Sequence, residues 1–262
     1  MSNILEQICE YKKTIIIRDK NNISLEKAKK LSKAITSKSN FYASIHDKLQ
    51  NNKLAIIAEI KKQSPSQGVL TENFSVAEIA KSYQEGGAAA ISVLTDEKYF
   101  KGNNENIKIA KENSNLPILR KDFIIDEYQI YQSKVIGADA ILLILSCLTK
   151  EKAKIFANLA HDLGLDILIE THNAEEIEIA LTLKGKLIGV NNRNLKTLDI
   201  SLENVKNLQK LIPNDKILIC ESGINSIEEV KELQKENINS FLIGGFLLKQ
   251  SNITETLKKI TS

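Results

Sequence analysis

Two residues of opposite charge, Glu59 and Lys61, stand at the end of an apolar run and are the first candidates for chemistry. The run Leu54–Ala58 predicts a buried strand, and side chains two apart on a strand point to the same face. An ion pair buried only for stability gains little, because desolvation can cancel its Coulomb attraction. Buried neighbouring charges also shift each other's pKa, as acid–base catalysis requires. The spacing alone leaves both a catalytic pair and a structural ion pair open.

The elements that must position this pair follow a regular pattern from residue 54 onward, where short apolar runs alternate with segments of helical period. The runs recur roughly every 20–35 residues, the length of one β–α unit. They show no polar alternation, which indicates strands covered on both faces, as in a parallel sheet. The predicted strands are Leu54–Ala58, Ala88–Leu94, Leu116–Leu119, Ala140–Leu145, Ile167–Ile169, Leu187–Val190, Ile217–Ile219 and Phe241–Ile243.

Helix signals lie between these runs. Ser75 with Glu78, Asn173 with Glu176 and Ser226 with Glu229 are capping-box patterns that predict helix starts. Glycines predict the ends of three helices, at Gly86-Gly87, at Gly164 for the helix over 150–163, and near Gly185.

Eight strands, each followed by a helix, predict a (β/α)₈ TIM barrel. A doubly wound sheet is the competing architecture, but it favours a Gly-rich phosphate loop after its first strand, and Gly68 alone does not supply one. Residues 1–50 fall outside the repeat and predict an N-terminal helical extension packed on the barrel. Its core-facing residues are expected to be Ile4, Leu5 and Ile8 on one helix and Leu25, Ala28, Leu31 and Ile35 on another. We expect residues 1–262 to form a single barrel domain.

Composition and short motifs limit the kinds of partner and the cellular location that we expect. The net charge of +3 and the absence of tryptophan give no reason to expect nucleic acid. No apolar run approaches the ~20 residues of a membrane span, and no signal-peptide layout begins the chain. The three cysteines, Cys9, Cys147 and Cys220, have neither metal spacing nor the layout of a disulfide framework. We therefore expect a cytoplasmic protein without a metal site. For its assembly, we expect a monomer or weak homo-oligomer.

Polar residues gather at the predicted strand ends, where a parallel barrel carries its active site. Strand four, ending at Ser146-Cys147, is the exception. Each residue also has an ordinary explanation: Lys121 could pair with Asp122, Glu170 could cap a helix, and His172 is interpreted as a loop histidine without a ligand role. Together they favour catalysis. They are Glu59, Lys61 and Ser64; Ser92, Thr95 and Asp96; Arg120, Lys121 and Asp122; Glu170, Thr171 and His172; Asn191, Asn192, Arg193 and Asn194; and Glu221.

A separate cluster, Ser222-Gly223 and Gly244-Gly245, follows the last two strands. Glycines let backbone N–H groups approach an anion, and the serine hydroxyl adds a donor. The loops after strands seven and eight, with a short helix such as one over 246–248, form the usual phosphate site of this barrel. A small phosphorylated substrate is therefore predicted.

These motifs in chain order resemble the indole-3-glycerol phosphate synthase family over roughly residues 50–248. Seven blocks carry the resemblance: Ile57-Ala58-Glu59-Ile60-Lys61-Lys62 with Ser64-Pro65-Ser66, Ser92-Val93-Leu94-Thr95-Asp96-Glu97 with Tyr99-Phe100 and Gly102, Leu119-Arg120-Lys121-Asp122-Phe123-Ile124-Ile125-Asp126, Ile169-Glu170, Gly189-Val190-Asn191-Asn192-Arg193, Glu221-Ser222-Gly223-Ile224, and Leu242-Ile243-Gly244. The resemblance implies a lyase of tryptophan biosynthesis. Its reaction converts 1-(2-carboxyphenylamino)-1-deoxyribulose 5-phosphate to indole-3-glycerol phosphate, CO₂ and water without metal or organic cofactor.

The resemblance also implies a role for each rim residue. Lys121 would be the general acid for ring closure and Glu170 the base of the dehydration. Burial or the neighbouring cations Lys61 and Arg193 would lower the pKa of Lys121 enough for it to act as an acid. Lys61 would polarise the substrate and help with later proton transfers, and Glu59 would support these groups. Asn191 and Glu221 would contact the sugar hydroxyls and Lys121, Arg193 would meet the anthranilate carboxylate, and Ser64 would make a further substrate contact. The phosphate would be bound by Ser222, Gly223, Gly244 and Gly245.

Two positions depart from the family pattern. Asn194 replaces the usual aspartate after Arg193, and Gly245-Phe246 replaces small or acidic residues. Three rival functions remain at this point: another phosphosugar barrel such as an isomerase, a Schiff-base aldolase with Lys121 as nucleophile, and a barrel that only binds a phosphate ligand.

Overall fold

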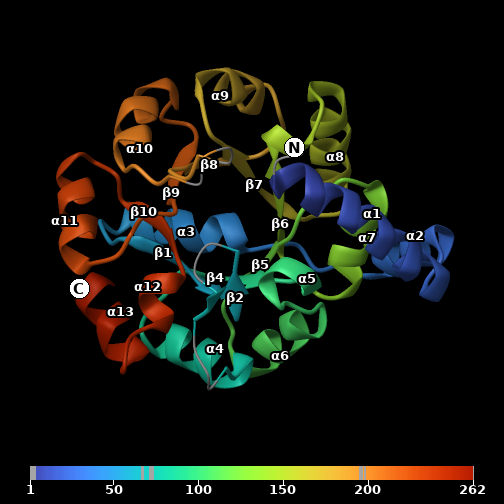
Figure 1. Cartoon of the computed structure of the whole chain (residues 1–262), viewed down its shortest axis with the longest axis horizontal. Coiled ribbons are helices and arrows are strands. Elements are labelled where there is room, and N and C mark those ends of the chain that lie inside the picture. The colour runs from blue at the N-terminus through green and yellow to red at the C-terminus, as the bar shows by residue number, and fades with distance from the viewer. Residues whose placement is uncertain (1–3, 66–67, 71–73, 195–196, 198, 262) are drawn as a thin grey trace.

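The computed structural model describes residues 4–65, 68–70, 74–194, 197 and 199–261, and eight parallel strands among them close into a barrel (Figure 1). The strands neighbour one another in the order β1-β10-β9-β8-β7-β6-β5-β4, and β4 pairs with β1 to complete the ring. Each predicted apolar run is one of these strands, so the (β/α)₈ prediction is confirmed. The barrel strands are β1 (Ala55–Ile60), β4 (Ala90–Leu94), β5 (Ile118–Lys121), β6 (Ala140–Ile144), β7 (Asp166–Thr171), β8 (Leu187–Asn191), β9 (Ile217–Glu221) and β10 (Ser240–Ile243).

Helices surround the barrel and begin where the sequence signals place them. The side chains of Ser75, Asn173 and Ser226 each accept a hydrogen bond from the backbone N–H three residues on, as predicted. The helix predicted to stop near Gly185 instead ends at Leu181. The outer helices are α4 (Val76–Glu85), α6 (Glu105–Asn113), α7 (Glu127–Val135), α8 (Lys150–Asp162), α9 (Ala174–Leu181), α10 (Glu203–Leu208), α11 (Ile227–Lys235) and α13 (Ile253–Thr261).

Short elements complete the connections. In the part of the chain that the structure describes, the loops contain the helical turns α5 (Glu97–Phe100) and α12 (Gly245–Leu248) and the 3₁₀ turns η1 (Leu145–Cys147) and η2 (Gln209–Leu211). A short hairpin of two-residue strands, β2 (Gln63–Ser64) and β3 (Gly68–Val69), follows β1 and was not predicted from the sequence. Ser66, part of the motif around it, lies outside the described residues.

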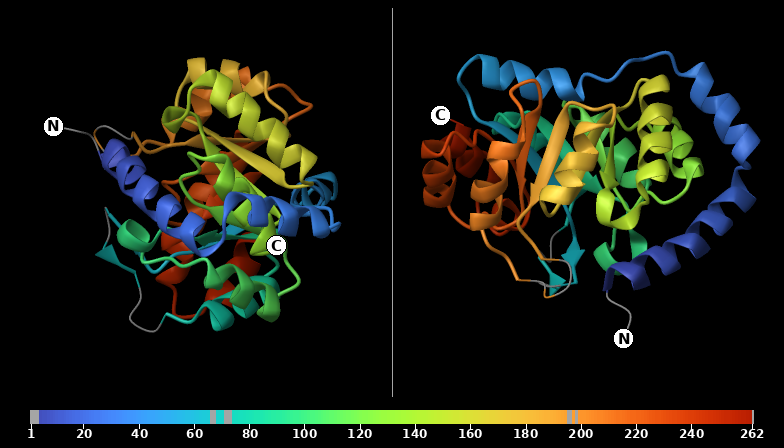
Figure 2. Two further views of the ribbon diagram at one scale, coloured as in Figure 1. Left: turned by 90° about the vertical axis from the view of Figure 1, so that its right-hand side faces the viewer. Right: turned by 90° about the horizontal axis from the view of Figure 1, so that it is seen from above.

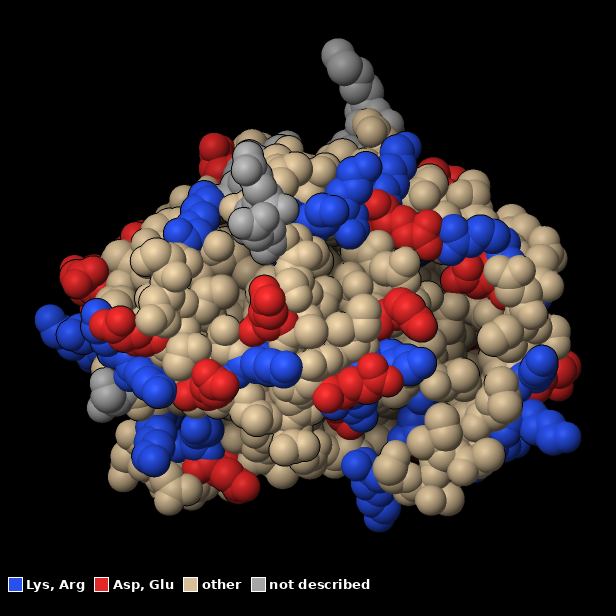
Figure 3. Space-filling model, turned by 90° about the horizontal axis from the view of Figure 1, so that it is seen from below, with Lys and Arg blue, Asp and Glu red and all other residues tan. Residues whose placement is uncertain are grey.

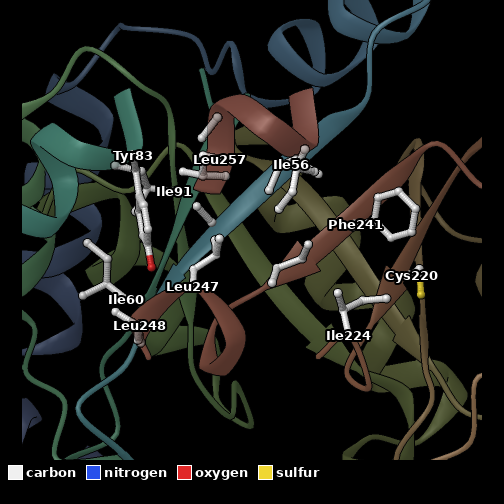
Figure 4. Close-up of a cluster of buried hydrophobic side chains, with 14 of the residues drawn as sticks. Ile56, Ile60, Tyr83, Ile91, Cys220, Ile224, Phe241, Leu247, Leu248 and Leu257 are labelled. Atoms are coloured by element: carbon white, nitrogen blue, oxygen red, sulfur yellow. The ribbon is translucent and has the colours of Figure 1, made fainter. Parts of the chain in front are cut away.

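Alternation along the strands separates two apolar layers. In β1, Ala55 and Ile57 pack with the inward-facing residues of the other strands, whereas Ile56, Ala58 and Ile60 pack with the outer helices. Figure 4 shows part of the outer layer, in which Ile56 and Ile60 of β1 lie near Tyr83 of α4 and Leu247 of α12. Glu59 continues the inward series, so the end of β1 delivers its carboxylate to the mouth of the barrel.

Three helices precede the barrel: α1 (Ile4–Asn22), α2 (Leu25–Ala34) and α3 (Phe41–Gln50). Phe41 and Ile45 of α3 are fully buried against the inward-facing strand residues, so α3 closes one end of the barrel. Helix α1 lies toward the opposite end, on the side of the β2–β3 hairpin (Figure 2). The predicted core role of Leu31 is wrong, because 38% of this side chain is exposed on α2.

Lysine and arginine are interspersed with aspartate and glutamate on the face that Figure 3 presents. Among the described residues, no helix combines the length and the apolar character that crossing a membrane would require.

Candidate active site

A pocket of about 210 Å³ opens where the carboxyl ends of the strands meet. All twelve residues that the sequence predicted for the site line this pocket: Glu59, Lys61, Ser64, Lys121, Glu170, Asn191, Arg193, Glu221, Ser222, Gly223, Gly244 and Gly245. They come from β1, β5, β7, β8, β9 and β10 and the loops that follow. Helix α1 adds Ile4, Leu5 and Ile8 to the wall, so Ile4 and Leu5 face the pocket rather than a closed core.

The first charge pair sits at the end of β1. Lys61 donates from Nζ to Oε1 of Glu59 over 2.5 Å, and the Glu59 side chain is almost completely buried. Gly244 makes room for this carboxylate: a Cβ added at Gly244 would lie 2.6 Å from Glu59 Oε1. Gly244 therefore leaves the space that the Glu59 carboxylate occupies, in addition to its place in the loop after β10.

Lys121 projects from the end of β5 between two carboxylates. Its Nζ lies 3.0 Å from Oε2 of Glu170 and 2.5 Å from Oε2 of Glu221. Asn191 donates from Nδ2 to the other oxygen of Glu170 over 3.0 Å. On β8, Gly189 leaves the space that Glu221 occupies, since a Cβ there would lie 1.9 Å from Glu221 Oε1. The ends of four strands thus fix one ammonium and two carboxylates.

The carboxylates, not the cations, dominate the electrostatics around Lys121. Burial lowers the pKa of Lys121, but the charges of Glu170, Glu221 and Glu59 outweigh burial and raise it above its ordinary value. The expected lowering of this pKa by burial or by Lys61 and Arg193 is therefore wrong. Both carboxylates lie at hydrogen-bond distance, whereas neither expected cation is among the groups that chiefly shift this pKa.

The two carboxylates beside Lys121 are shifted in opposite directions. Burial raises the pKa of Glu170, but Lys121, His172 and Asn191 outweigh it and lower the pKa. Burial also raises the pKa of Glu221, and the charge of Glu170 adds to this, so that it reaches about 7 despite Lys121. These opposite shifts favour the ionised form of Glu170 and the protonated form of Glu221.

The loops after β9 and β10 form another part of the pocket wall. Ser222 and Gly223 both adopt positive φ, at 65° and 93°. This left-handed conformation is uncommon for serine. Gly244 precedes α12, which begins at Gly245, and this is the short helix that the sequence predicted. Backbone N–H groups and one hydroxyl are thus concentrated at this edge, as an anion site requires.

Apolar and basic groups complete the wall. The rings of Phe100 and Phe123 lie 6.1 Å apart, and both side chains line the pocket with Arg193. Burial lowers the pKa of the Arg193 guanidinium. Asn194, which departs from the family pattern, accepts a hydrogen bond from the N–H of Thr197 in its own loop over 3.3 Å.

Sequence reasoning missed three contributions. His172 approaches Glu170, Gly189 accommodates Glu221, and the apolar face of α1 closes part of the pocket. A signal existed for two of them: His172 follows Glu170 by two residues, and Gly189 begins the block that ends in Arg193. No signal joined α1 to the pocket, because helical periodicity does not reveal what the apolar face contacts.

Asp122, next to Lys121, does not pair with it. Its carboxylate contacts Lys12 of α1 at 2.7 Å and Arg120 at 3.2 Å, and Lys12 also meets Asp96 at 2.8 Å. Thr95 donates to Asp122 over 2.7 Å. The structural pairing suggested for Lys121 with Asp122 is therefore wrong. Asp96 and Asp122 instead hold α1 in place through Lys12, and Thr95 supports the Asp122 carboxylate.

A closed parallel barrel whose strand ends bring lysines, carboxylates and a glycine-rich loop to one pocket has the fold and the type of site found in (β/α)₈ enzymes. The profile of the family described as indole-3-glycerol phosphate synthase matches residues 5–260. The chain belongs to this family.

Relatives with that name are similar over most of their length. One from Polynucleobacter asymbioticus is 46% identical over 250 residues, which are 93% of each chain. One from Lachnoclostridium phytofermentans is 41% identical over 268 residues, covering 99% of both chains. Among solved structures, tryptophan synthase subunit alpha from Legionella pneumophila aligns with a TM-score of 0.62 at 14% identity, covering 86% of this chain and 97% of that one. At that identity, the last likeness shows the fold alone.

Proposed function

We propose that the chain closes the indole ring of 1-(2-carboxyphenylamino)-1-deoxyribulose 5-phosphate, releasing CO₂ and water to form indole-3-glycerol phosphate. The observation that carries this proposal is Lys121 held between Glu170 and Glu221 in a pocket that the loops after β9 and β10 also line. A proton donor, a base and an anion site then share one cavity. Family membership supports the same reaction.

In this proposal, Ser222, Gly223, Gly244 and Gly245 hold the phosphate. Arg193 meets the anthranilate carboxylate, and Phe100 and Phe123 contact the aromatic ring. Both ends of the substrate are anionic, so these contacts stretch it across the pocket between two fixed points. Its reacting carbons then lie beside Lys121, which gains the rate advantage of proximity.

Ring closure begins when the aromatic carbon attacks the ribulose C2′ carbonyl and Lys121 protonates the oxygen. The raised pKa of Lys121 keeps it an ammonium, and the oxygen becomes a strong base only as the new bond forms, so transfer is favourable late in the step. Glu221 contacts Lys121 and has a pKa of about 7, which makes it a source for the replacement proton.

CO₂ then leaves, and the electron pair of the broken carbon–carboxylate bond returns to the ring. In the dehydration, Lys61 gives a proton to the departing hydroxyl, and Glu170 removes the proton from the carbon beside nitrogen, which restores aromaticity. Glu59 holds Lys61 in position through their short contact. Glu170 suits its role because its lowered pKa keeps it ionised when the base is needed.

The Schiff-base alternative is less favoured by the electrostatics. A nucleophilic lysine must be a neutral amine, which requires a lowered pKa, whereas the carboxylates around Lys121 raise it. Borohydride reduction with a phosphosugar should therefore leave no adduct on Lys121.

The deciding experiment is an indole-fluorescence assay of the purified chain with the carboxyphenylamino substrate. Product formation that depends on enzyme concentration is expected. Folded protein that yields no product would overturn the proposal. Gel filtration with light scattering would test the expected monomer or weak homo-oligomer in the same preparation.

A further inference from the structure

His172 lies behind Glu170, at the point where β7 passes into α9. Its imidazole is largely buried, with Nδ1 3.1 Å from Oε2 of Glu176 and Nε2 3.4 Å from Oε1 of Glu170. Nε2 is fully buried and makes no hydrogen bond within the described residues. A ring nitrogen this close to a carboxylate is placed to donate to it after a small rotation, as catalytic contacts often tighten when substrate binds.

The start of α9 fixes the ring. Asn173 caps the helix by accepting from the N–H of Glu176. Glu176 turns back and accepts both the backbone N–H of His172, over 2.8 Å, and the contact from Nδ1. The capping pattern read from the sequence therefore has a second use, because it holds the imidazole against Glu170.

Two carboxylates on opposite sides of one imidazole favour its doubly protonated form. Burial lowers the pKa of His172, but the contacts with Glu170 and Glu176 outweigh burial and raise it to about 10. Glu170 is thus contacted by an ammonium, an amide and an imidazolium, from Lys121, Asn191 and His172.

We propose that His172 is a positioning residue for Glu170, holding this carboxylate ionised and oriented toward the pocket from the side away from Lys121. The inference rests on the proposed role of Glu170 as the dehydration base. Lys121 must move its own proton to the substrate, so it is a neutral neighbour during part of the cycle. His172 supplies a charge that stays in place throughout.

The kinetic test compares His172→Gln, which keeps an amide donor without charge, with His172→Ala and with the matched control His161→Gln on the exposed side of α8. We expect kcat to fall about tenfold in His172→Gln and further in His172→Ala, with KM changed less than about twofold. The control should match the wild type.

The pH profile separates positioning from folding. Among the described residues, the charged groups that face Glu170 are Lys121, Glu221 and His172, and those that face His172 are Glu170 and Glu176. The thiol of Cys147 also lies near Glu170 and Glu176. Its contact with Cys9, burial and these charges raise its pKa, so it stays neutral. Without the imidazolium, Glu170 gains a proton more readily, so the acidic limb of kcat should move up by about one pH unit. A lower melting temperature with an unmoved limb, or a rise in KM alone, would overturn the proposal.

A measurement without substrate keeps this inference separate from the proposed function. Nitrogen-15 NMR of the free protein, with the His172 signal identified by its loss in His172→Gln, should show both ring nitrogens protonated at pH 8. The signal should change to that of a neutral ring in the Glu170→Gln/Glu176→Gln double variant. A neutral imidazole in the wild type at pH 8 would overturn the proposal, even if the ring-closing activity is present. If the wild type shows an imidazolium but no ring-closing activity, the positioning of Glu170 by His172 is supported and only the proposed reaction is overturned.

Discussion

Two clusters of buried charged side chains meet at the end of β5. Neighbouring residues at this strand end belong to different clusters. The anchor cluster comprises Lys12, Asp96, Arg120 and Asp122, and the rim cluster comprises Glu59, Lys61, Lys121, Glu170 and Glu221. Successive side chains on a strand point to opposite faces. Lys121 therefore enters the barrel mouth while Arg120 and Asp122 turn toward α1 and α7.

The clusters differ in charge balance and in space. Two cations and two anions balance in the anchor cluster, and burial, which alone would raise the pKa of Asp122, is outweighed by Lys12 and Arg120, which lower it. The rim cluster has three carboxylates for two lysines, and one of them, Glu221, titrates near neutral pH. A cavity of about 10 Å³ adjoins the anchor cluster, room for at most one water, against about 210 Å³ at the rim. In the anchor cluster every charge is paired and there is no room for a substrate, so the cluster stabilises the fold. In the rim cluster the charges are not fully paired and face a cavity, so a proton is available for transfer.

Replacing the lysine of the rim cluster should have the largest effect on activity. Lys121→Met removes the proton donor for ring closure, so we expect kcat to fall by about 10³-fold or more with little change in KM. Product fluorescence under saturating substrate measures it. A rise in KM at unchanged kcat would make Lys121 a binding residue.

The same substitution in the anchor cluster should act on stability instead. Lys12→Met leaves Asp96 and Asp122 buried without their shared cation, which should lower the free energy of unfolding by about 3 kcal/mol. Urea denaturation measures this loss. At a temperature where the variant remains folded, kcat should fall less than about tenfold, because Lys12 does not contact the pocket.

Lys13→Met is the matched control, since Lys13 forms an exposed pair with Glu10 on the same helix. Its removal should change the free energy of unfolding by less than about 0.5 kcal/mol. If Lys12→Met abolished activity as completely as Lys121→Met while staying folded, the distinction between the clusters would fail.

The barrel could be predicted because its signals are local. Each strand is an apolar run, and capping residues such as Ser75 and Asn173 act within three residues of themselves. The membership of the pocket could also be predicted, because a parallel barrel brings the residues after every strand to one rim.

The contacts within the rim could not be predicted, because they depend on rotamers and on segments distant in sequence. Lys12 and Asp122 are joined only by the docking of α1, a helix outside the βα repeat. The pKa of Lys121 depends on which charges reach it within 3 Å, and its carboxylate partners lie on β7 and β9. The position of a charged residue at a strand end predicts that it lies at the rim, but not which other charged residue it contacts.

Gly189 tests whether the rim cluster depends on space as well as charge. The added Cβ of Gly189→Ala would overlap Glu221 and push its carboxylate away from Lys121. We expect kcat to fall roughly 10- to 100-fold, as misplacement of a catalytic group by about 1 Å does. In a double-mutant cycle with Glu221→Ala the two losses should not add. Full additivity would mean that Gly189 acts elsewhere.

The smallest expected effect is a pH dependence confined to the rim. The folded-state pKa of Glu221 is raised to about 7 from an ordinary value of 4.5, so the folded chain holds this proton to higher pH than the unfolded chain does. The stability contributed by that proton is fully present below about pH 4.5 and is lost as pH rises through about 7. Lys121 and Glu170 face Glu221 and share its titration.

Glu221→Gln removes this titration. The unfolding free energy of the variant should therefore rise relative to the wild type between pH 5 and pH 8, by about 1 kcal/mol or more. Urea denaturation of both proteins at each pH measures the difference. A difference that stays flat across this range would mean that Glu221 is ionised throughout, and the rim carboxylates would then be as fully paired as those around Lys12.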